Sequence, residues 1–126
     1  MSICIDDLLG VPYKLNGRTK NGFDCYGLLI EVEKRFNHIL PDFVNASEEN
    51  FLECLKMAVD VLPLKSIEEP TKEGDIILIV NVYGIPFHIG AYLGNGMFIH
   101  CNKYGVHLEK INMYKNRIGR VYTWQE

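Results

Sequence analysis

Apolar residues in the first third of the chain recur with the period of an α-helix. After Asp24 they occupy positions 28, 29, 32 and 36, which lie on one face of a helix. This pattern predicts an amphipathic helix from Asp24 to about Asn37. The Leu40–Asp42 segment, which contains a proline, ends it.

Two other segments are also predicted to be helical. Residues 2–10 look like a short helix that ends at Gly10. Ser47 has the character of an N-cap, and the helix that it begins extends to about residue 59. The inward-facing residues of this helix are Phe51, Leu52, Leu55 and Val59. Residues 14–22 are rich in Asn, Gly, Lys and Arg and are predicted to form a loop.

After Pro63 the pattern changes to short β-type runs separated by Gly and Asn turns. The strands predicted there are Ile76–Val82, Phe87–Leu93, Met97–Asn102, Val106–Lys110 and Arg120–Trp124. Helices followed by consecutive strands are typical of an α+β fold with an antiparallel sheet, since a parallel sheet would need strands and helices to alternate.

The hairpin formed by residues 88–102 allows the strand pairing to be predicted in detail. If residues 94–96 form a three-residue loop, Leu93 lies opposite Met97. One face of the hairpin is then wholly apolar, and the other carries both His88 and His100. A two-residue turn would mix the two sets, so we favour the three-residue loop. In this register the two histidines are diagonal neighbours and Cys101 faces the core.

Composition and charge exclude several classes of protein. The 126 residues are 48% hydrophobic and 23% charged, which is typical of one soluble globular domain, and we expect a single domain over residues 1–126. The net charge of −3, with scattered Lys and Arg, gives no indication of nucleic-acid or membrane binding. The apolar runs are far shorter than the roughly 20 residues that span a bilayer. The N-terminus lacks the basic region of a signal peptide, so we expect synthesis in the cytoplasm and any export by another route.

The four cysteines, at positions 4, 25, 54 and 101, are widely separated. They include no Cys-x-x-Cys pair, so their spacing does not indicate a zinc site or a thioredoxin motif. The chain has enough apolar residues to fold without disulfides, and free thiols are therefore expected. For any one of them, a buried and chemically silent side chain is the ordinary expectation.

Cys25 lies at the start of a predicted helix, directly after Asp24. Unpaired N–H groups and the positive end of the helix dipole favour thiolate over thiol at that position. The same N–H groups could bind the oxyanion of a tetrahedral intermediate. The structural alternative is that Asp24 is only an N-cap and Cys25 only a buried side chain.

A thiol nucleophile needs a base, and His88 and His100 share the polar face of the hairpin. His88 could take the thiol proton while His100 orients its ring. Each histidine also has a purely structural interpretation. His88 could be a strand-end residue that is hydrogen-bonded to the backbone, and His100 could be a strand histidine whose hydrogen bonds are all satisfied. His38 and His107 have no partner implied by spacing, and we expect both at the surface.

Several segments together resemble the NlpC/P60 superfamily of cysteine peptidases. The N-terminal signature is Gly10–Tyr13 followed by Gly22–Leu28, and the strand half is represented by Lys72–Ile77 and His88–His100. These segments follow the family's order and spacing from residue 8 to about 124. The resemblance implies an α+β, papain-like fold in which N-terminal helices pack on an antiparallel sheet of five or six strands.

The resemblance also implies roles for individual residues. Cys25 would be the nucleophile, His88 the base and acid, and His100 the third, polar member of the triad. Tyr13 matches a family tyrosine that lies by the nucleophile and contacts substrate, although it could simply cover the core beside Pro12. No metal or organic cofactor is implied.

Asp24 and Tyr26, which flank the nucleophile, are expected to contribute to substrate binding. Most family members have Ser after the cysteine, whereas this chain has Tyr26. An aromatic residue there, together with Glu31–Phe36 and Leu40–Asp42, is more similar to the branch encoded in phage tail gene clusters. That similarity implies phage tail proteins as possible partners and carriage in a phage tail.

The family resemblance implies hydrolysis of peptide bonds in bacterial peptidoglycan stem peptides, often between D-γ-glutamate and a diamino acid. The stem peptide would then be the partner, with no nucleic acid or membrane involved. Two alternatives remain. One is a non-catalytic tail-assembly or interaction module with the same fold, and the other is a related thiol acyltransferase or amidase, since papain-like sites support acyl transfer generally.

Overall fold

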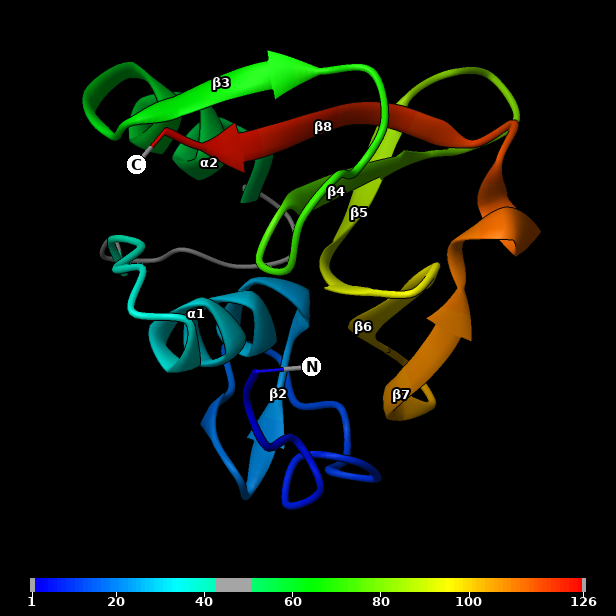
Figure 1. Ribbon diagram of the computed structural model, residues 1–126. Helices are drawn as coiled ribbons and strands as arrows, with labels where there is room; N and C mark the ends of the chain where they lie inside the picture. Colours follow the sequence, from blue (N-terminus) through cyan, green and yellow to red (C-terminus); the bar gives the residue numbers. More distant parts are fainter. Residues whose placement is uncertain (1, 43–50, 126) are drawn as a thin grey trace.

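The computed structural model describes residues 2–42 and 51–125 (Figure 1). Its helices are α1 (Cys25–Arg35), α2 (Phe51–Val61) and the 3₁₀ helix η1 (Ile111–Tyr114). The strands are β1 (Arg18–Thr19), β2 (Gly22–Phe23), β3 (Leu64–Ile67), β4 (Ile76–Val80), β5 (Pro86–Gly94), β6 (Met97–Asn102), β7 (Gly105–Lys110) and β8 (Ile118–Trp124).

Six of the strands form one antiparallel sheet in the order β3-β8-β4-β5-β6-β7, and β1 and β2 form a separate small hairpin. Helix α1 lies against β5 and β6, as Figure 1 shows below the centre of the sheet. The sequence-based expectation of an α+β fold with an antiparallel sheet of five or six strands is confirmed.

The N-terminal segment differs from the prediction. Residues 6–10 form turns and not a helix. The chain turns away because Gly10 adopts a φ of +84°, a left-handed conformation that glycine tolerates. Its N–H donates to Val106 O, and Val106 N–H donates to Val11 O, so the segment pairs with the start of β7 instead. The predicted loop at 14–22 also contains the short strands β1 and β2.

Strand β3 was not predicted, and α2 extends two residues beyond its predicted end. Only one residue of Leu64–Ile67 is buried, as is usual for a strand at the edge of a sheet, so its pattern is weak. Leu55 and Ala58 of α2 are completely buried. The expected N-cap, Ser47, lies outside the described residues.

The β5–β6 hairpin keeps the predicted register away from its turn. Ala91 pairs with Ile99 and Tyr92 with Phe98, as expected. At the turn, however, Gly94 and not Leu93 lies opposite Met97. The turn itself therefore has two residues, Asn95 and Gly96, both with positive φ, as a type I′ turn requires. A β-bulge between Tyr92 and Gly94 absorbs the extra residue, which is why the faces stay segregated.

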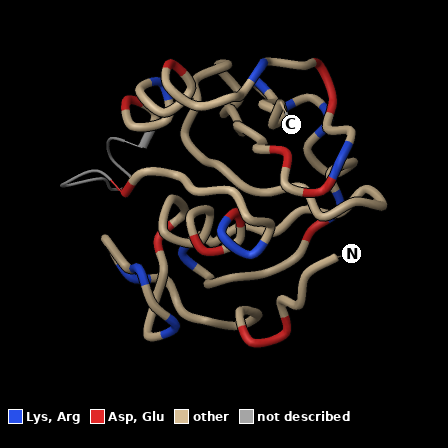
Figure 2. The backbone as a smooth tube through the Cα atoms, turned by 60° about the vertical axis from the view of Figure 1, so that its left-hand side comes forward, with Lys and Arg blue, Asp and Glu red and all other residues tan. Residues whose placement is uncertain are grey.

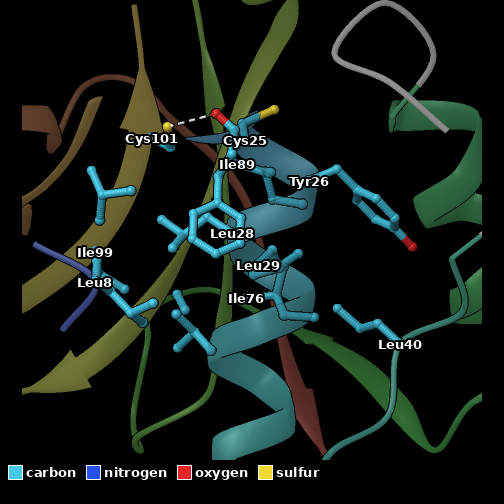
Figure 3. Packing of buried hydrophobic residues seen from close by; sticks show 14 of the residues in the cluster. Leu8, Cys25, Tyr26, Leu28, Leu29, Leu40, Ile76, Ile89, Ile99 and Cys101 are labelled. Carbon is cyan, nitrogen blue, oxygen red and sulfur yellow. Dashed lines mark hydrogen bonds between the residues drawn. The ribbon is translucent and has the colours of Figure 1, made fainter. Parts of the chain in front are cut away.

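The two faces of the hairpin belong to different clusters of buried residues. Its apolar face packs with α1 in the larger cluster, which Figure 3 shows from close by. That cluster includes Leu28, Leu29, Ile89, Ile99 and Cys101. The other face holds a smaller cluster of Ile77, Ile79 and Phe98, with Tyr92 and Tyr114 packed against it. The prediction that Cys101 faces the core is confirmed.

Charged residues are distributed along the backbone, and neither sign is confined to one side in the view of Figure 2. This agrees with the scattered Lys and Arg of the sequence. Among the described residues, no helix has both the length and the apolar character required to cross a bilayer.

The buried side chain of Glu33 connects α1 with strand β8, next to the edge of the sheet. Glu33 Oε1 accepts a hydrogen bond from Trp124 Nε1 at 3.0 Å and lies 3.0 Å from His38 Nδ1. His38 stacks on Trp124, with ring centroids 4.3 Å apart, so the expectation of a surface histidine is wrong. Glu33 Oε2 is buried without a hydrogen-bond partner in the described part of the chain. Burial raises the pKa of Glu33 to about 7, against the opposing effect of its hydrogen bonds to His38 and Trp124.

We predict that Glu33→Gln becomes more stable relative to the wild type as the pH rises from about 5 to 8. The folded protein holds the Glu33 proton up to about pH 7, whereas the unfolded chain releases it near pH 4.5. The contribution of Glu33 is therefore present at low pH and lost as the pH rises through this window, and the full difference corresponds to about 3 kcal/mol. Urea denaturation of both proteins across this pH range measures it.

The comparison of the two proteins isolates Glu33. The buried histidines His88 and His100 have lowered pKa values, so their contributions to stability rise with pH, but they do so equally in both proteins. Glu69→Gln, at an exposed position, is the matched control and should leave the pH dependence unchanged. A stability difference between wild type and Glu33→Gln that does not vary with pH would contradict the prediction.

Candidate active site

Cys25 is the first residue of α1, and its position depends on the residue before it. Asp24 has an extended backbone, and its Oδ1 accepts a hydrogen bond from Gly27 N–H at 2.7 Å, as expected of an N-cap. Cys25 is only 1% exposed. Figure 3 shows its sulfur directed away from the apolar side chains that line the rest of the helix. The thiol therefore lies at the positive end of the helix dipole.

Asp24 and Tyr26, the residues expected to contribute to substrate binding, are both fully buried and make structural contacts. Asp24 also accepts hydrogen bonds from Asn16 N–H at 3.1 Å and from Arg18 Nη1 at 2.9 Å. The Tyr26 hydroxyl donates to Pro41 O at 2.6 Å, and burial raises the pKa of Tyr26 well above its ordinary value. The two residues attach the loop before α1 and the segment after it to the start of the helix.

Gly27 lets the preceding loop cross the first turn of α1. A Cβ at this position would collide with the backbone oxygen of Gly17 and would lie 3.0 Å from Arg18 Nη1. The glycine after Asp24 and Cys25 is therefore required by packing. The Arg18–Asp24 ion pair could not keep its geometry beside a larger residue.

Tyr13 lies beside the strand that leads into Cys25. It forms a parallel bridge with Phe23 and is partly buried against the larger cluster. This position near the helix start is compatible both with a contact to substrate and with a role in covering the core.

The remaining cysteines are placed as ordinary side chains. Cys54 and Cys101 are buried, and the Cys101 thiol donates to Phe23 O at 3.1 Å. Cys4 is exposed. Four free thiols agree with the expectation that no disulfide is needed.

His88 and His100 are in direct contact, as the predicted register required. His88 Nε2 lies 2.7 Å from His100 Nδ1, and the two rings meet edge to face. Both side chains are buried, and His100 stacks on Phe98. Gly90 leaves room for this arrangement, since a Cβ there would lie 3.2 Å from the His100 Cβ and 2.9 Å from Ile99 O.

Glu109 and His107, which were not predicted as site residues, extend this hydrogen-bonded series beyond His100. His100 Nε2 lies 3.0 Å from Glu109 Oε1, and His107 Nε2 lies 2.7 Å from the same oxygen. His107 pairs directly with His100 across β6 and β7, so the expectation that it has no partner is wrong, although its side chain is 33% exposed. A two-residue turn at Lys103 and Tyr104 could have predicted this arrangement. The strand register that follows from such a turn places His107 and Glu109 on the same face of the sheet as His100.

Burial determines the charge state of the two central histidines. It lowers the pKa of His88 to about 3, assisted by the positive charge that His100 and His107 carry when protonated. Burial, with His107 again assisting, lowers the pKa of His100 to about 4. Glu109 opposes both shifts. Both rings are therefore neutral at neutral pH, as a general base must be.

The carboxylate of Glu109 determines which nitrogens carry the protons. Partial burial raises its pKa, but hydrogen bonds from His107, Tyr114 and His100 outweigh this and hold the pKa of Glu109 below its ordinary value. An ionised carboxylate only accepts, so His100 must carry its proton on Nε2. His100 Nδ1 is then an acceptor, and His88 must donate from Nε2. We infer from this network that His88 Nδ1 has a free lone pair.

A surface groove opens beside the two histidines. It has a volume of about 350 Å³. Its lining combines aromatic, polar and cationic residues with the histidines: Ile79, Phe87, His88, His100, Asn102, Lys103, Tyr104, Tyr114 and Arg117. A groove of this character could hold a polar chain with acidic groups.

Comparison with known proteins shows what this arrangement is related to. A sequence model described as the NlpC/P60 family matches residues 10–124. This chain belongs to the NlpC/P60 family.

Two curated relatives are similar to most of the chain. The probable peptidoglycan endopeptidase LytE of Bacillus subtilis is 30% identical over 105 residues, covering 83% of this chain and 27% of LytE. The murein DD-endopeptidase MepH of Escherichia coli is 26% identical over 117 residues, covering 91% of this chain and 40% of MepH. The chain thus spans less than half the length of either relative.

Solved NlpC/P60 structures share the fold. An NlpC/P60 family protein from Bacillus cereus superposes with a TM-score of 0.66 at 21% identity, covering 94% of this chain and 37% of that protein. NlpC2 from Trichomonas vaginalis has a TM-score of 0.67 at 23% identity, with coverages of 94% and 45%. The NlpC/p60 domain of the peptidoglycan hydrolase SagA has a TM-score of 0.60 at 18% identity, with coverages of 93% and 89%.

Gly27→Ala should lower the free energy of unfolding by about 3 kcal/mol, because overpacking against a rigid backbone cannot be relieved by side-chain rotation. The loss occurs although alanine has the higher helix propensity. Urea denaturation measures the change. Lys34→Ala, at an exposed position of the same helix, is the control and should change stability by less than about 0.5 kcal/mol. A variant at position 27 as stable as the wild type would show that the loop does not need this close approach.

Proposed function

We propose that this chain is a thiol-dependent endopeptidase that cleaves peptide bonds in bacterial peptidoglycan stem peptides. Two relatives named as peptidoglycan or murein endopeptidases support this substrate class. The observation that carries the proposal is the hydrogen-bonded series His88–His100–Glu109, because it leaves one imidazole nitrogen as an acceptor in a family whose reaction needs a base.

Each residue has a role in the proposed reaction. The Cys25 sulfur attacks the carbonyl carbon of the peptide bond while His88 Nδ1 takes the thiol proton. The backbone N–H at the start of α1 stabilises the resulting oxyanion. The protonated His88 then gives its proton to the leaving amine, and water hydrolyses the thioester to regenerate the thiol. His100 holds the His88 ring, and Glu109 holds His100.

The bond that we propose is the one between D-γ-glutamate and a diamino acid. MepH is named for a DD-linkage, so the two linkages are the alternatives to separate. Defined muropeptides that contain only one of the two bonds distinguish them by the product released. We further propose a phage tail as the setting, which rests on Tyr26 and the segment that follows it. Tail genes beside the coding gene would support that setting.

Cys25→Ala should abolish the release of new amino termini from purified sacculi, because no other group in the mechanism replaces the nucleophile. Cys4→Ala is the matched control, since it removes an exposed thiol and should leave the rate unchanged. Circular dichroism verifies that both variants fold. Equal hydrolysis by the wild type and Cys25→Ala would remove Cys25 from the mechanism, and no hydrolysis by any of the three would favour a non-catalytic module.

Glu109→Gln should lower kcat by about tenfold or more while KM changes little. The amide can still accept a hydrogen bond from His100, but it no longer supplies the negative charge that raises the pKa of both histidines. The imidazolium that forms during the reaction is therefore less stable. Glu109→Asp, which keeps the charge, should restore part of the rate.

Steady-state kinetics on a defined muropeptide separates these parameters. The control is Lys110→Ala, an exposed change on the same strand. An unchanged kcat in Glu109→Gln would show that His100 orients His88 without help from the carboxylate.

A further inference from the structure

His100, His107 and Glu109 together offer three ligand atoms for a metal ion. One ligand atom of each residue lies within 4.8 Å of the other two, and both histidine Nε2 atoms lie within hydrogen-bond distance of Glu109 Oε1. Two imidazoles and one carboxylate are a common ligand set for zinc. The histidines belong to adjacent antiparallel strands, β6 and β7, and this gives the group a rigid base.

The atoms around this group resemble the outer contacts of a metal site. His107 Nδ1 lies 3.0 Å from Gly105 O, His100 Nδ1 lies 2.7 Å from His88 Nε2, and the Tyr114 hydroxyl bonds Glu109. Each ligating residue therefore has a partner that would orient it, which is the arrangement usual around protein-bound zinc.

The distances between the ligand atoms are slightly short for direct coordination. Tetrahedral zinc with bonds near 2.1 Å separates its ligands by about 3.4 Å. Here Glu109 Oε1 lies 3.0 Å from His100 Nε2 and 2.7 Å from His107 Nε2, as expected for groups joined by hydrogen bonds. Glu109 and His107 are partly exposed, with 25% and 33% of their side chains accessible, so both can adjust and an ion can enter from solvent.

We propose that His100, His107 and Glu109 bind Zn²⁺ and that binding reverses the proton arrangement of the His88–His100 pair. An ion on His100 Nε2 requires the His100 proton to move to Nδ1, which faces His88 Nε2. His88 Nε2 must then accept, and the His88 proton moves to Nδ1. Each of these two rings keeps one proton. His107 directs Nδ1 to Gly105 O and offers Nε2 to the ion.

The consequence for activity rests on the proposed function. With a proton on Nδ1, His88 no longer has a lone pair to take the thiol proton of Cys25. Zn²⁺ at this site would therefore be an inhibitor and not a cofactor, because it changes the tautomer of His88. Its action differs from direct capture of the Cys25 thiolate by zinc, and the two can be separated by experiment.

Binding is measured first, by isothermal titration of ZnCl₂ into the Cys4→Ala/Cys25→Ala protein, in which neither the exposed thiol nor the proposed nucleophile can contribute. We expect one bound ion. Adding His107→Gln should weaken binding at least about tenfold, whereas adding His38→Gln, a histidine elsewhere in the fold, should not. Equal affinity with and without His107→Gln, or no binding at all, would overturn the proposal.

The tautomer change is then read from the ring ¹⁵N signals of the same double variant. Saturating ZnCl₂ should move the His88 proton from Nε2 to Nδ1, and unchanged His88 signals would overturn this step. For the active protein, the readout is the ratio of rates with and without ZnCl₂. This ratio should fall in the wild type and remain closer to one in His107→Gln. If the metal-free protein cleaves nothing, the proposed function fails while the binding and tautomer results still decide the metal site.

Discussion

The buried carboxylate of Asp24 determines where α1 begins, and the rest of the candidate site depends on this. It accepts hydrogen bonds from Gly27, Asn16 and Arg18 while it is completely withdrawn from solvent. A buried charge needs such partners, because leaving it unpaired would cost several kcal/mol. The requirement holds the preceding loop across the first turn of the helix. Cys25 consequently starts the helix at the same place in every molecule.

A second carboxylate organises the opposite side of the site. Glu109 can only accept, so it imposes one direction on the hydrogen bonds that lead through His100 to His88. Without an acceptor at the end, two neutral imidazoles could share their protons in either order. The direction in which these hydrogen bonds are donated is thus determined by a residue of β7, although the proposed base lies on β5. For this reason Glu109, two strands away from the proposed base, is predicted to affect the proposed reaction.

Much of this could be predicted from the sequence where the pattern was strong and local. The α1 periodicity, the strand-rich second half and the His88–His100 contact follow from alternation that only one register satisfies. The errors arose where one residue changes the outcome. Gly10 turns the chain out of a helix, a bulge between Tyr92 and Gly94 shortens the loop, and the edge strand β3 has little apolar pattern. The contact of Glu109 with His100 was missed because it depends on the β6–β7 register, and the burial of Tyr26 was not foreseen because it depends on a contact with Pro41.

The same series of hydrogen bonds carries both the proposed catalysis and its proposed control by a metal ion. A proton on His100 Nε2 and a metal ion at that nitrogen are mutually exclusive, and each sets the opposite tautomer in His88. Because neither buried histidine readily becomes cationic, the pair cannot relieve this conflict by taking up a second proton. In the proposed scheme the pair is therefore a two-state element, and the proton or metal ion on His100 Nε2 determines whether His88 can act as the base. An isolated catalytic histidine, without a second imidazole behind it, would have no such alternative state.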